Sequence, residues 1–344
     1  MKKILLFAVC LLLSLNVFSQ EKNFRPAQIN FGFPLSTTNV KKAKEYTNAF
    51  SINLLVGISK NERSLALAGV GNVISNNATG LQIAGVSNYI GNAGNGIAVA
   101  GVTNINKGAY NGIQVSGVYN YSGSGNGIAV AGVTNMSKDS FIGLQLSGVT
   151  NIAGDVKGLQ FAGVANIAKK VKGVQFASIL NVAEESNFPI AFVNIIKNGK
   201  MGVALSYDMM NNTMLSFRSG GKYTYGILGV GYNNLVNDGC KVVAEAGYGI
   251  HIPITDWIEI NNEFKATSVG FSNDKTCFNA SYLLAPSFTF LNHFNVFGGA
   301  SFNYFMSDYL NSNDLIPNKY LWSKDGNYNQ RMYIGYQIGL QYVF

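Results

Sequence analysis

Apolar and polar residues alternate along most of the chain, and between residues 64 and 194 the alternation itself recurs every 15 to 16 residues. Each copy reads Gly-φ-Gln/Ala-φ-Ala/Ser-Gly-Val-x-Asn, where φ is an apolar residue. A period of two places successive side chains on opposite faces of a strand, so each copy predicts a β-strand. Charged residues collect with glycine, asparagine and serine between the copies, which is typical of turns. The copies begin at Gly80, Gly96, Gly112, Gly127, Gly143, Gly158 and Gly173.

One copy supplies a strand of roughly ten residues and a turn, about the length with which a tilted strand crosses a bilayer. The copies at Gly96 and Gly127 share one version of the motif, and those at Gly80, Gly112 and Gly143 share another. This pattern favours antiparallel hairpins with a true repeat of 31 residues. The alternative is a β-solenoid joined to a smaller barrel, in which each copy is one coil and asparagines stack as a ladder. Those asparagines include Asn88, Asn104 and Asn120.

Beyond residue 198 the strands become longer and richer in aromatic residues. Alternation predicts strands over 241–252, 257–269, 278–290 and 294–306. The final strand places Tyr336, Ile338, Leu340, Tyr342 and Phe344 on one face. This strand resembles the C-terminal signal of bacterial outer-membrane proteins, which the barrel-assembly machinery recognises.

The links between these strands alternate in length. Short turns at 253–256 and 291–293 alternate with longer links at 233–239, 271–276 and 307–329. Short periplasmic turns and long external loops are the habit of bacterial barrels. We therefore expect an all-β fold, a transmembrane antiparallel up-and-down barrel of about 18 strands, within a range of roughly 16 to 20.

The N-terminus predicts export. Lys2 and Lys3 precede an apolar stretch too short for a membrane helix, and Ser19 ends a plausible cleavage site. Residues 1–19 are expected to be a signal peptide and residues 20–344 the barrel, with repeat strands over 64–197 and longer strands over 198–344.

Composition agrees with an envelope barrel. The chain is 47% hydrophobic with only 12% charged residues, whereas about one quarter is usual for soluble domains. The net charge of +8 is scattered, and its densest group, Lys169, Lys170 and Lys172, lies in a predicted turn, which argues against nucleic-acid binding. Cys240 and Cys277 each follow a polar turn; they either form a disulfide or remain unpaired small hydrophobic residues.

Four charged residues share the inward face of two neighbouring predicted strands: Glu245, Glu259, Glu263 and Lys265. They either line a pore constriction or form a salt-bridged network that fills a closed lumen. His251 and His293 have no metal-like spacing, and no nucleophile motif or cofactor fingerprint is present. We therefore expect no enzymatic activity, no metal and no cofactor.

The repeats resemble the Gly-Leu-Gln surface-repeat proteins of Leptospira and Bacteroidetes, whose units read Gly-Leu-Gln-x-x-x-x-x-Asn. The early copies depart from that pattern at Ala98 and Ala129, which replace glutamine. The resemblance covers roughly 130 residues and implies an envelope location, with no established activity to carry over.

Taken together, these features predict a protein of the cell outer membrane that contacts membrane lipid, lipopolysaccharide and the barrel-assembly machinery. A lumen wide enough for water follows if about 16 or more strands close one barrel, so the expected function is a passive porin-like channel. The alternatives are a non-conducting surface protein that uses the 307–329 loop for binding or a structural role, and the solenoid fused to a small barrel.

Overall fold

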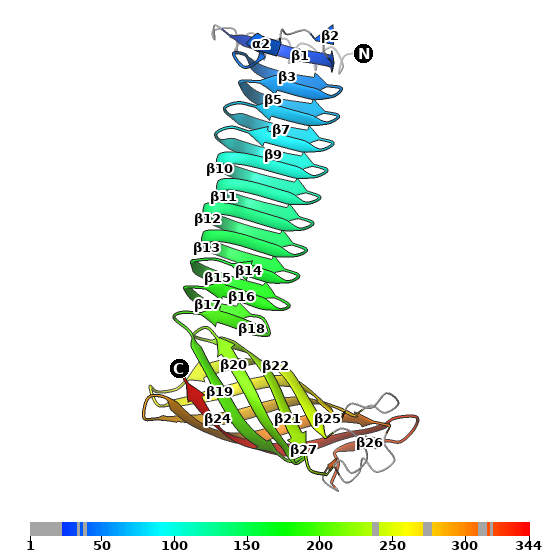
Figure 1. Cartoon of the computed structure of the whole chain (residues 1–344), viewed down its shortest axis with the longest axis vertical. Helices are drawn as coiled ribbons and strands as arrows, with labels where there is room; N and C mark the ends of the chain where they lie inside the picture. The colour runs from blue at the N-terminus through cyan, green and yellow to red at the C-terminus, as the bar shows by residue number, and fades with distance from the viewer. Residues whose placement is uncertain are drawn as a thin grey trace, which may run out of the picture. The chain divides into compact units, whose positions relative to one another are not determined.

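A computed structural model of the chain describes residues 23–32, 35–36, 40–235, 241–270, 277–308, 315–316 and 319–344. The predicted signal peptide and its cleavage site lie outside these residues. The strands form two sheets, one of mainly parallel strands (β1 to β18) and one of antiparallel strands (β19 to β27), as Figure 1 shows. The chain divides into two compact units, the first ending at Gly163 and the second beginning at Val164.

The first unit contains one short helix and thirteen strands among its described residues. Their bounds are β1 (Phe24–Gly32), β2 (Leu35–Ser36), α2 (Val40–Ala43), β3 (Thr47–Asn53), β4 (Val56–Ser59), β5 (Asn61–Ala68), β6 (Gly71–Ile74), β7 (Ala78–Ala84), β8 (Ser87–Ile90), β9 (Gly94–Ala100), β10 (Thr103–Ser116), β11 (Tyr119–Ala131), β12 (Thr134–Ser147) and β13 (Thr150–Ala162).

The second unit begins with further repeat strands and continues into the antiparallel sheet. The repeat strands are β14 (Ala165–Ile167), β15 (Lys170–Ala177), β16 (Leu180–Ala183), β17 (Glu185–Ile190) and β18 (Val193–Ile196). The others are β19 (Lys200–Asp208), β20 (Asn212–Gly220), β21 (Thr224–Asn233), β22 (Val242–Pro253), β23 (Ile258–Val269), β24 (Cys277–Phe290), β25 (Phe294–Ser307), β26 (Trp322–Lys324) and β27 (Asn329–Val343).

The repeats form a parallel β-solenoid of about ten coils, so the expected 18-stranded antiparallel barrel is wrong. Gly112 pairs in parallel and in register with Gly96 on one side and with Gly127 on the other. Every copy is therefore one coil, and the 31-residue hairpin does not exist. Strand length and alternation suit a coil as well as a membrane crossing, and only the pairing direction separates the two.

Each copy begins with glycine because the backbones of successive coils lie very close together at this position. Gly112 has a φ of 126°, a region that L-residues rarely adopt. A Cβ atom at Gly112 would lie 2.0 Å from the carbonyl oxygen of Gly96. The motif glycine is therefore a packing requirement of the stack.

The interior of the coils is lined by asparagine and glutamine amides and by alanine, together with a few larger side chains such as Ile74, Ile90 and Tyr110, while many other large aliphatic side chains point outward. Asn104, which is 1% exposed, donates through Nδ2 to Oδ1 of Asn120 at 2.9 Å, to the Val115 carbonyl at 2.8 Å and to the Ala98 carbonyl at 3.3 Å. Its Oδ1 accepts a hydrogen bond from Asn88 at 2.9 Å. This asparagine ladder satisfies buried amides that would otherwise be costly to desolvate.

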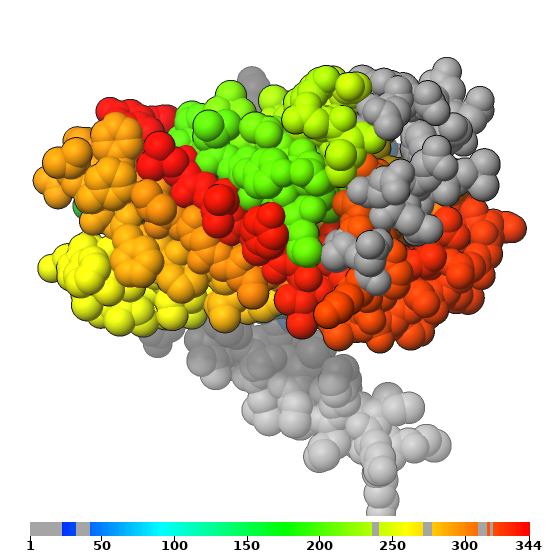
Figure 2. Space-filling model, turned by 90° about the horizontal axis from the view of Figure 1, so that it is seen from below, coloured from blue at the N-terminus to red at the C-terminus, as the bar shows by residue number. Residues whose placement is uncertain are grey.

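The antiparallel sheet closes into a barrel of eight strands, β19 to β25 and β27, while β26 is a short strand paired with the start of β27. Closure comes from β27, which pairs with both β25 and β19; Figure 2 shows the red β27 beside the green β19. An eight-stranded barrel is just wide enough for its own side chains to fill. The bounds of β22 to β25 coincide with the four strands predicted from alternation to within one residue.

Candidate functional site

The interior of the barrel gathers charged and polar side chains into one buried group. Arg218 Nη1 lies 3.0 Å from Glu263 Oε1, and Lys265 Nζ lies 3.2 Å from Glu245 Oε2 and 3.6 Å from Glu263 Oε2. The Tyr225 hydroxyl donates to Glu263 at 2.8 Å. We call Arg218, Tyr225, Glu245, Glu263 and Lys265 the ion network; their exposed fractions are between 0% and 6%.

Further hydrogen bonds connect the ion network to the surrounding strands. Ser216 of β20 donates to Glu245 at 3.1 Å, and Lys265 donates to the Gln337 side chain of β27. Gln337 in turn donates to Ser206 of β19 at 2.8 Å. The network thus crosses the interior from β19 to β23 and leaves few of its polar atoms unpaired.

The four charged residues predicted to face inward are brought into the barrel by the structure. Glu245, Glu263 and Lys265 contact one another, whereas Glu259 lies nearer the barrel end where β19 begins. There Lys200 Nζ lies 2.6 Å from Glu259, and His251 Nδ1 lies 3.4 Å from Glu259. Each of the four charged residues therefore lies within 4 Å of a residue that can carry the opposite charge.

The barrel end at the start of β19 is closed by the last repeat strands. Asn194 of β18 donates through its backbone nitrogen to Ser219 Oγ at 2.9 Å and through Nδ2 to the Ser219 carbonyl at 3.1 Å. Thr224 donates to the Pro189 carbonyl at 2.7 Å, and the rings of Phe192 and Tyr248 stack 5.2 Å apart. This end carries the turns at 221–223, 254–257 and 291–293 and the end of β27.

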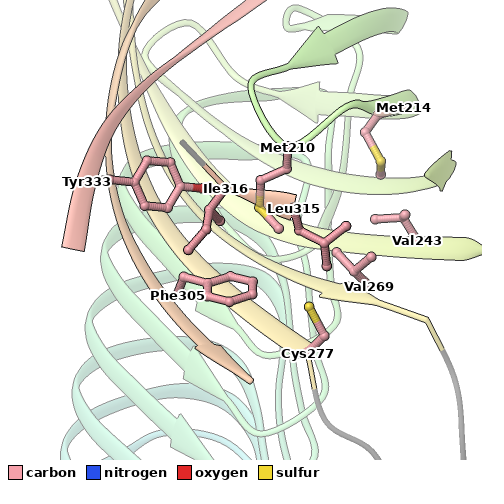
Figure 3. Packing of buried hydrophobic residues seen from close by; sticks show 9 residues of the cluster. All are labelled: Met210, Met214, Val243, Val269, Cys277, Phe305, Leu315, Ile316 and Tyr333. Atoms are coloured by element: carbon pink, nitrogen blue, oxygen red, sulfur yellow. The ribbon is translucent and has the colours of Figure 1, made fainter. Parts of the chain in front are cut away.

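The opposite end of the barrel is closed by an apolar cluster that we call the apolar plug. Leu315 and Ile316, from the segment between β25 and β26, are 7% and 6% exposed. Figure 3 shows them lying between side chains from the barrel strands. The plug consists of Met210, Met214, Val243, Val269, Cys277, Phe305, Leu315, Ile316 and Tyr333.

Between the ion network and the apolar plug, the described residues leave a cavity of about 20 Å³ beside Asp208, Asn279 and Asn303. This volume accommodates about one water molecule. A closed barrel of eight strands that its own side chains fill in this way does not fit a porin-like channel, so that expectation is wrong. The channel was expected because about 18 strands were assigned to one barrel, whereas a barrel of eight strands encloses only a packed interior.

Of the two cysteines that were considered for a disulfide, the structure describes one. Cys277 is a buried free thiol within the apolar plug, whereas Cys240 lies outside the described residues. Whether the two ever pair therefore stays a prediction.

The five predicted residues of the assembly strand lie on the outer face of β27. Tyr336, Ile338, Leu340, Tyr342 and Phe344 are each between 44% and 60% exposed. They continue an apolar surface formed by the other barrel strands. That surface also includes Val203, Leu205, Leu215, Leu228, Val230, Val242, Ile250, Phe264, Leu284, Phe288, Val296, Phe302 and Ile334.

Four residues of the barrel interior were not predicted from the sequence: Arg218, Tyr225, Leu315 and Ile316. Arg218 carries a signal that was available, because it is the one charged residue within β20. Leu315 and Ile316 carry a weaker signal, an apolar pair inside a polar loop. Within the described residues no cluster of three or more histidine, cysteine or acidic side chains is arranged to hold a metal, and no helix is long and apolar enough to span a membrane.

No family model matches this chain, and neither a curated protein nor a solved structure is significantly similar to it.

Proposed function

We propose that the barrel is a non-conducting anchor in an outer membrane and that it tethers the β-solenoid to that membrane. The observation that carries this proposal is the inverted polarity of the barrel. Its interior holds the ion network, while its exterior presents large aliphatic and aromatic side chains to the surroundings. In water this exterior would favour aggregation, whereas a bilayer solvates it.

The dimensions of the barrel support the same role. Its eight strands are between 9 and 15 residues long, and a tilted strand of about 9 to 11 residues spans the hydrocarbon core of a bilayer. Every strand has both neighbours, so no edge is exposed to lipid.

The lengths of the links give the anchor a direction. The turns at 221–223, 254–257 and 291–293 lie at one end, together with Lys200 and Phe344. At the other end the turn at 209–211 is short, but the three other links are longer, and the longest connects Ser307 to Asn329. In bacterial barrels short turns face the periplasm. The repeat strands β14 to β18, which join the barrel at its short-turn end, are then periplasmic, and no folded domain has to cross the membrane.

With the short-turn end of the barrel in the periplasm, the surroundings of the opposite end are also defined. The outer leaflet around the long-loop end would be lipopolysaccharide, and insertion would depend on recognition of β27 by the assembly machinery. The resemblance of the repeats to envelope surface-repeat proteins supports the compartment. At the long-loop end Leu321, Trp322 and Tyr328 are more than 40% exposed, which suits a secondary role in binding a surface ligand.

The proposal is tested by refolding the mature chain into lipid vesicles and comparing two leucine-to-arginine variants. Leu215→Arg places a charge on the outer face of β20 and should destabilise the inserted barrel by roughly 2–4 kcal/mol. Leu321→Arg, a matched control at a 61% exposed leucine outside the barrel strands, should change stability little. The readouts are vesicle insertion and the heat-dependent mobility of the folded barrel on gels.

Planar-bilayer recordings of the inserted protein should be silent. Stable conductance steps of porin size would contradict a sealed lumen. Equal effects of the two arginine substitutions would contradict lipid contact at the barrel surface.

A further inference from the structure

The solenoid of the first unit carries a flat, uncharged and strongly apolar face that the barrel anchor does not use. The outward residues of β3, β5, β7, β9, β11 and β13, and of the C-terminal halves of β10 and β12, stand in two in-register columns. One column runs from Phe50 to Leu159 and the other from Ile52 to Phe161. We call these sixteen residues the apolar face; all are phenylalanine, leucine, isoleucine or valine.

Half of the sixteen residues of the apolar face are exposed and the other half are partly exposed. Ile97, Ile113 and Ile128 in one column are 36–42% exposed, and Phe161 in the other is 37% exposed. Such values are high for large aliphatic side chains at the centre of a regular sheet, and they arise because the residues between the two columns, such as Gln82, Ala98 and Gln114, point into the coil instead. Soluble proteins seldom leave a contiguous apolar patch above a few hundred Å² uncovered.

The area of the face matches what a stable dimer requires. Eight strands spaced about 4.8 Å apart, each contributing about five residues of roughly 3.3 Å rise, give a flat projection of roughly 600 Å². Two such faces would remove about 1,200 Å² from water, and protruding side chains raise this figure. That total reaches the range of specific protein–protein interfaces, about 1,200–2,000 Å².

The spacing of the side chains on the apolar face indicates which partner fits it. Its side chains form ridges with the strand spacing of a parallel in-register sheet, and a second copy presents ridges with the same spacing, so that two faces interdigitate about 10 Å apart. The two columns contain no charged residue. Lys138, Asp139 and Asp155 lie within β12 and β13 but outside the columns, and Arg63 and Lys157 lie at the edge of the face, so two copies meet column to column without burying a charge. We propose that the occupant of the apolar face is the apolar face of a second copy of this chain.

The test is the mass of the full mature chain in detergent, measured by light scattering with the detergent contribution subtracted. The wild-type protein should be a dimer. Val115→Lys combined with Val130→Lys places charges on paired positions of the face and should weaken association at least about 100-fold, leaving monomers. The matched control is Tyr121→Lys combined with Met136→Lys, also paired and outward-facing but on the opposite side of the coils; it should remain dimeric.

Circular dichroism and the heat-dependent gel mobility of the barrel verify that each variant is folded. If the lysine pair disturbs the folding of the coils, the milder pair Val115→Ser and Val130→Ser is measured in its place. This pair should give an intermediate loss of dimer. A monomeric wild type, or a dimer that survives the face substitutions, overturns the proposal. Membrane anchoring is read separately by vesicle insertion, so failure of one proposal does not imply failure of the other.

Discussion

Arg218 and Glu263 form a salt bridge of 3.0 Å between β20 and β23, and their side chains are 3% and 0% exposed. The pair joins strands that are not neighbours in the sheet, so it crosses the barrel interior. Because an unpaired charge is very costly in such a place, each partner requires the other.

Removing one partner should therefore be severe. Glu263→Ala is expected to destabilise the barrel by roughly 3–5 kcal/mol, since Arg218 and Lys265 lose a buried counter-charge. Urea titration of the refolded barrel measures the loss. Glu184→Ala, which breaks an exposed salt bridge with Lys197, should change stability by less than about 1 kcal/mol. The double variant Arg218→Met, Glu263→Leu should recover part of the loss, and no recovery would contradict the pairing argument.

The asparagine ladder should be as sensitive to a single truncation. Asn104→Ala removes the hydrogen bonds with Asn88 and Asn120 and leaves buried amide groups unpaired, with an expected loss of roughly 2–4 kcal/mol. Asn95→Ala makes the same chemical change at an exposed position of the adjacent strand and should be nearly neutral. Hydrogen exchange across the coils localises the effect; equal protection in both variants would contradict a structural ladder.

Glu62 should make the solenoid less stable as the pH rises. This carboxyl group is 4% exposed and accepts hydrogen bonds from Asn48 and Ser51, and burial raises its pKa from 4.5 to about 7. The folded state therefore holds a proton that the unfolded state has already released, so stability is greatest below about pH 4.5, falls up to about pH 7 and is level above it.

The full effect of Glu62 corresponds to roughly 3 kcal/mol. Glu62→Gln, which cannot ionise, should remove this fall and be the more stable protein at pH 8. Denaturation of both proteins between pH 4 and pH 8 measures the difference. Parallel stability curves for the two proteins would show that Glu62 does not titrate in this range.

The apolar plug should hold Leu315 and Ile316 against the barrel. Leu315→Asp together with Ile316→Asp places two charges in an apolar cluster and should expel both side chains from it, because unpaired carboxylates are not buried. Limited proteolysis at residues 315 and 316 should then be at least about ten times faster. Leu321→Asp, at an exposed leucine nearby in sequence, is the control. The variant should still not conduct ions, because the ion network fills the barrel below the plug.

Much of the local structure was predictable from residue alternation. The strands β22 to β25 lie within one residue of the predicted segments, since a period of two identifies a strand with one apolar face in any all-β architecture. The same rule placed Glu245, Glu259, Glu263 and Lys265 on the inward face. It could not show that Arg218 is their partner, because its strand is adjacent to theirs neither in sequence nor in the sheet.

Residue alternation and the repeat period are enough to predict an all-β chain, the length of each repeat and the side of each strand that carries large apolar residues, because these follow from local backbone geometry. The parallel pairing of the repeats as coils, the closure of the barrel by eight strands and the position of Leu315 and Ile316 at its end depend on contacts between residues far apart in the chain. Alternation is the same for parallel and antiparallel neighbours. The choice is made by contacts between residues one coil apart, where Asn88, Asn104 and Asn120 join into a buried ladder and Gly96 and Gly112 meet without side chains.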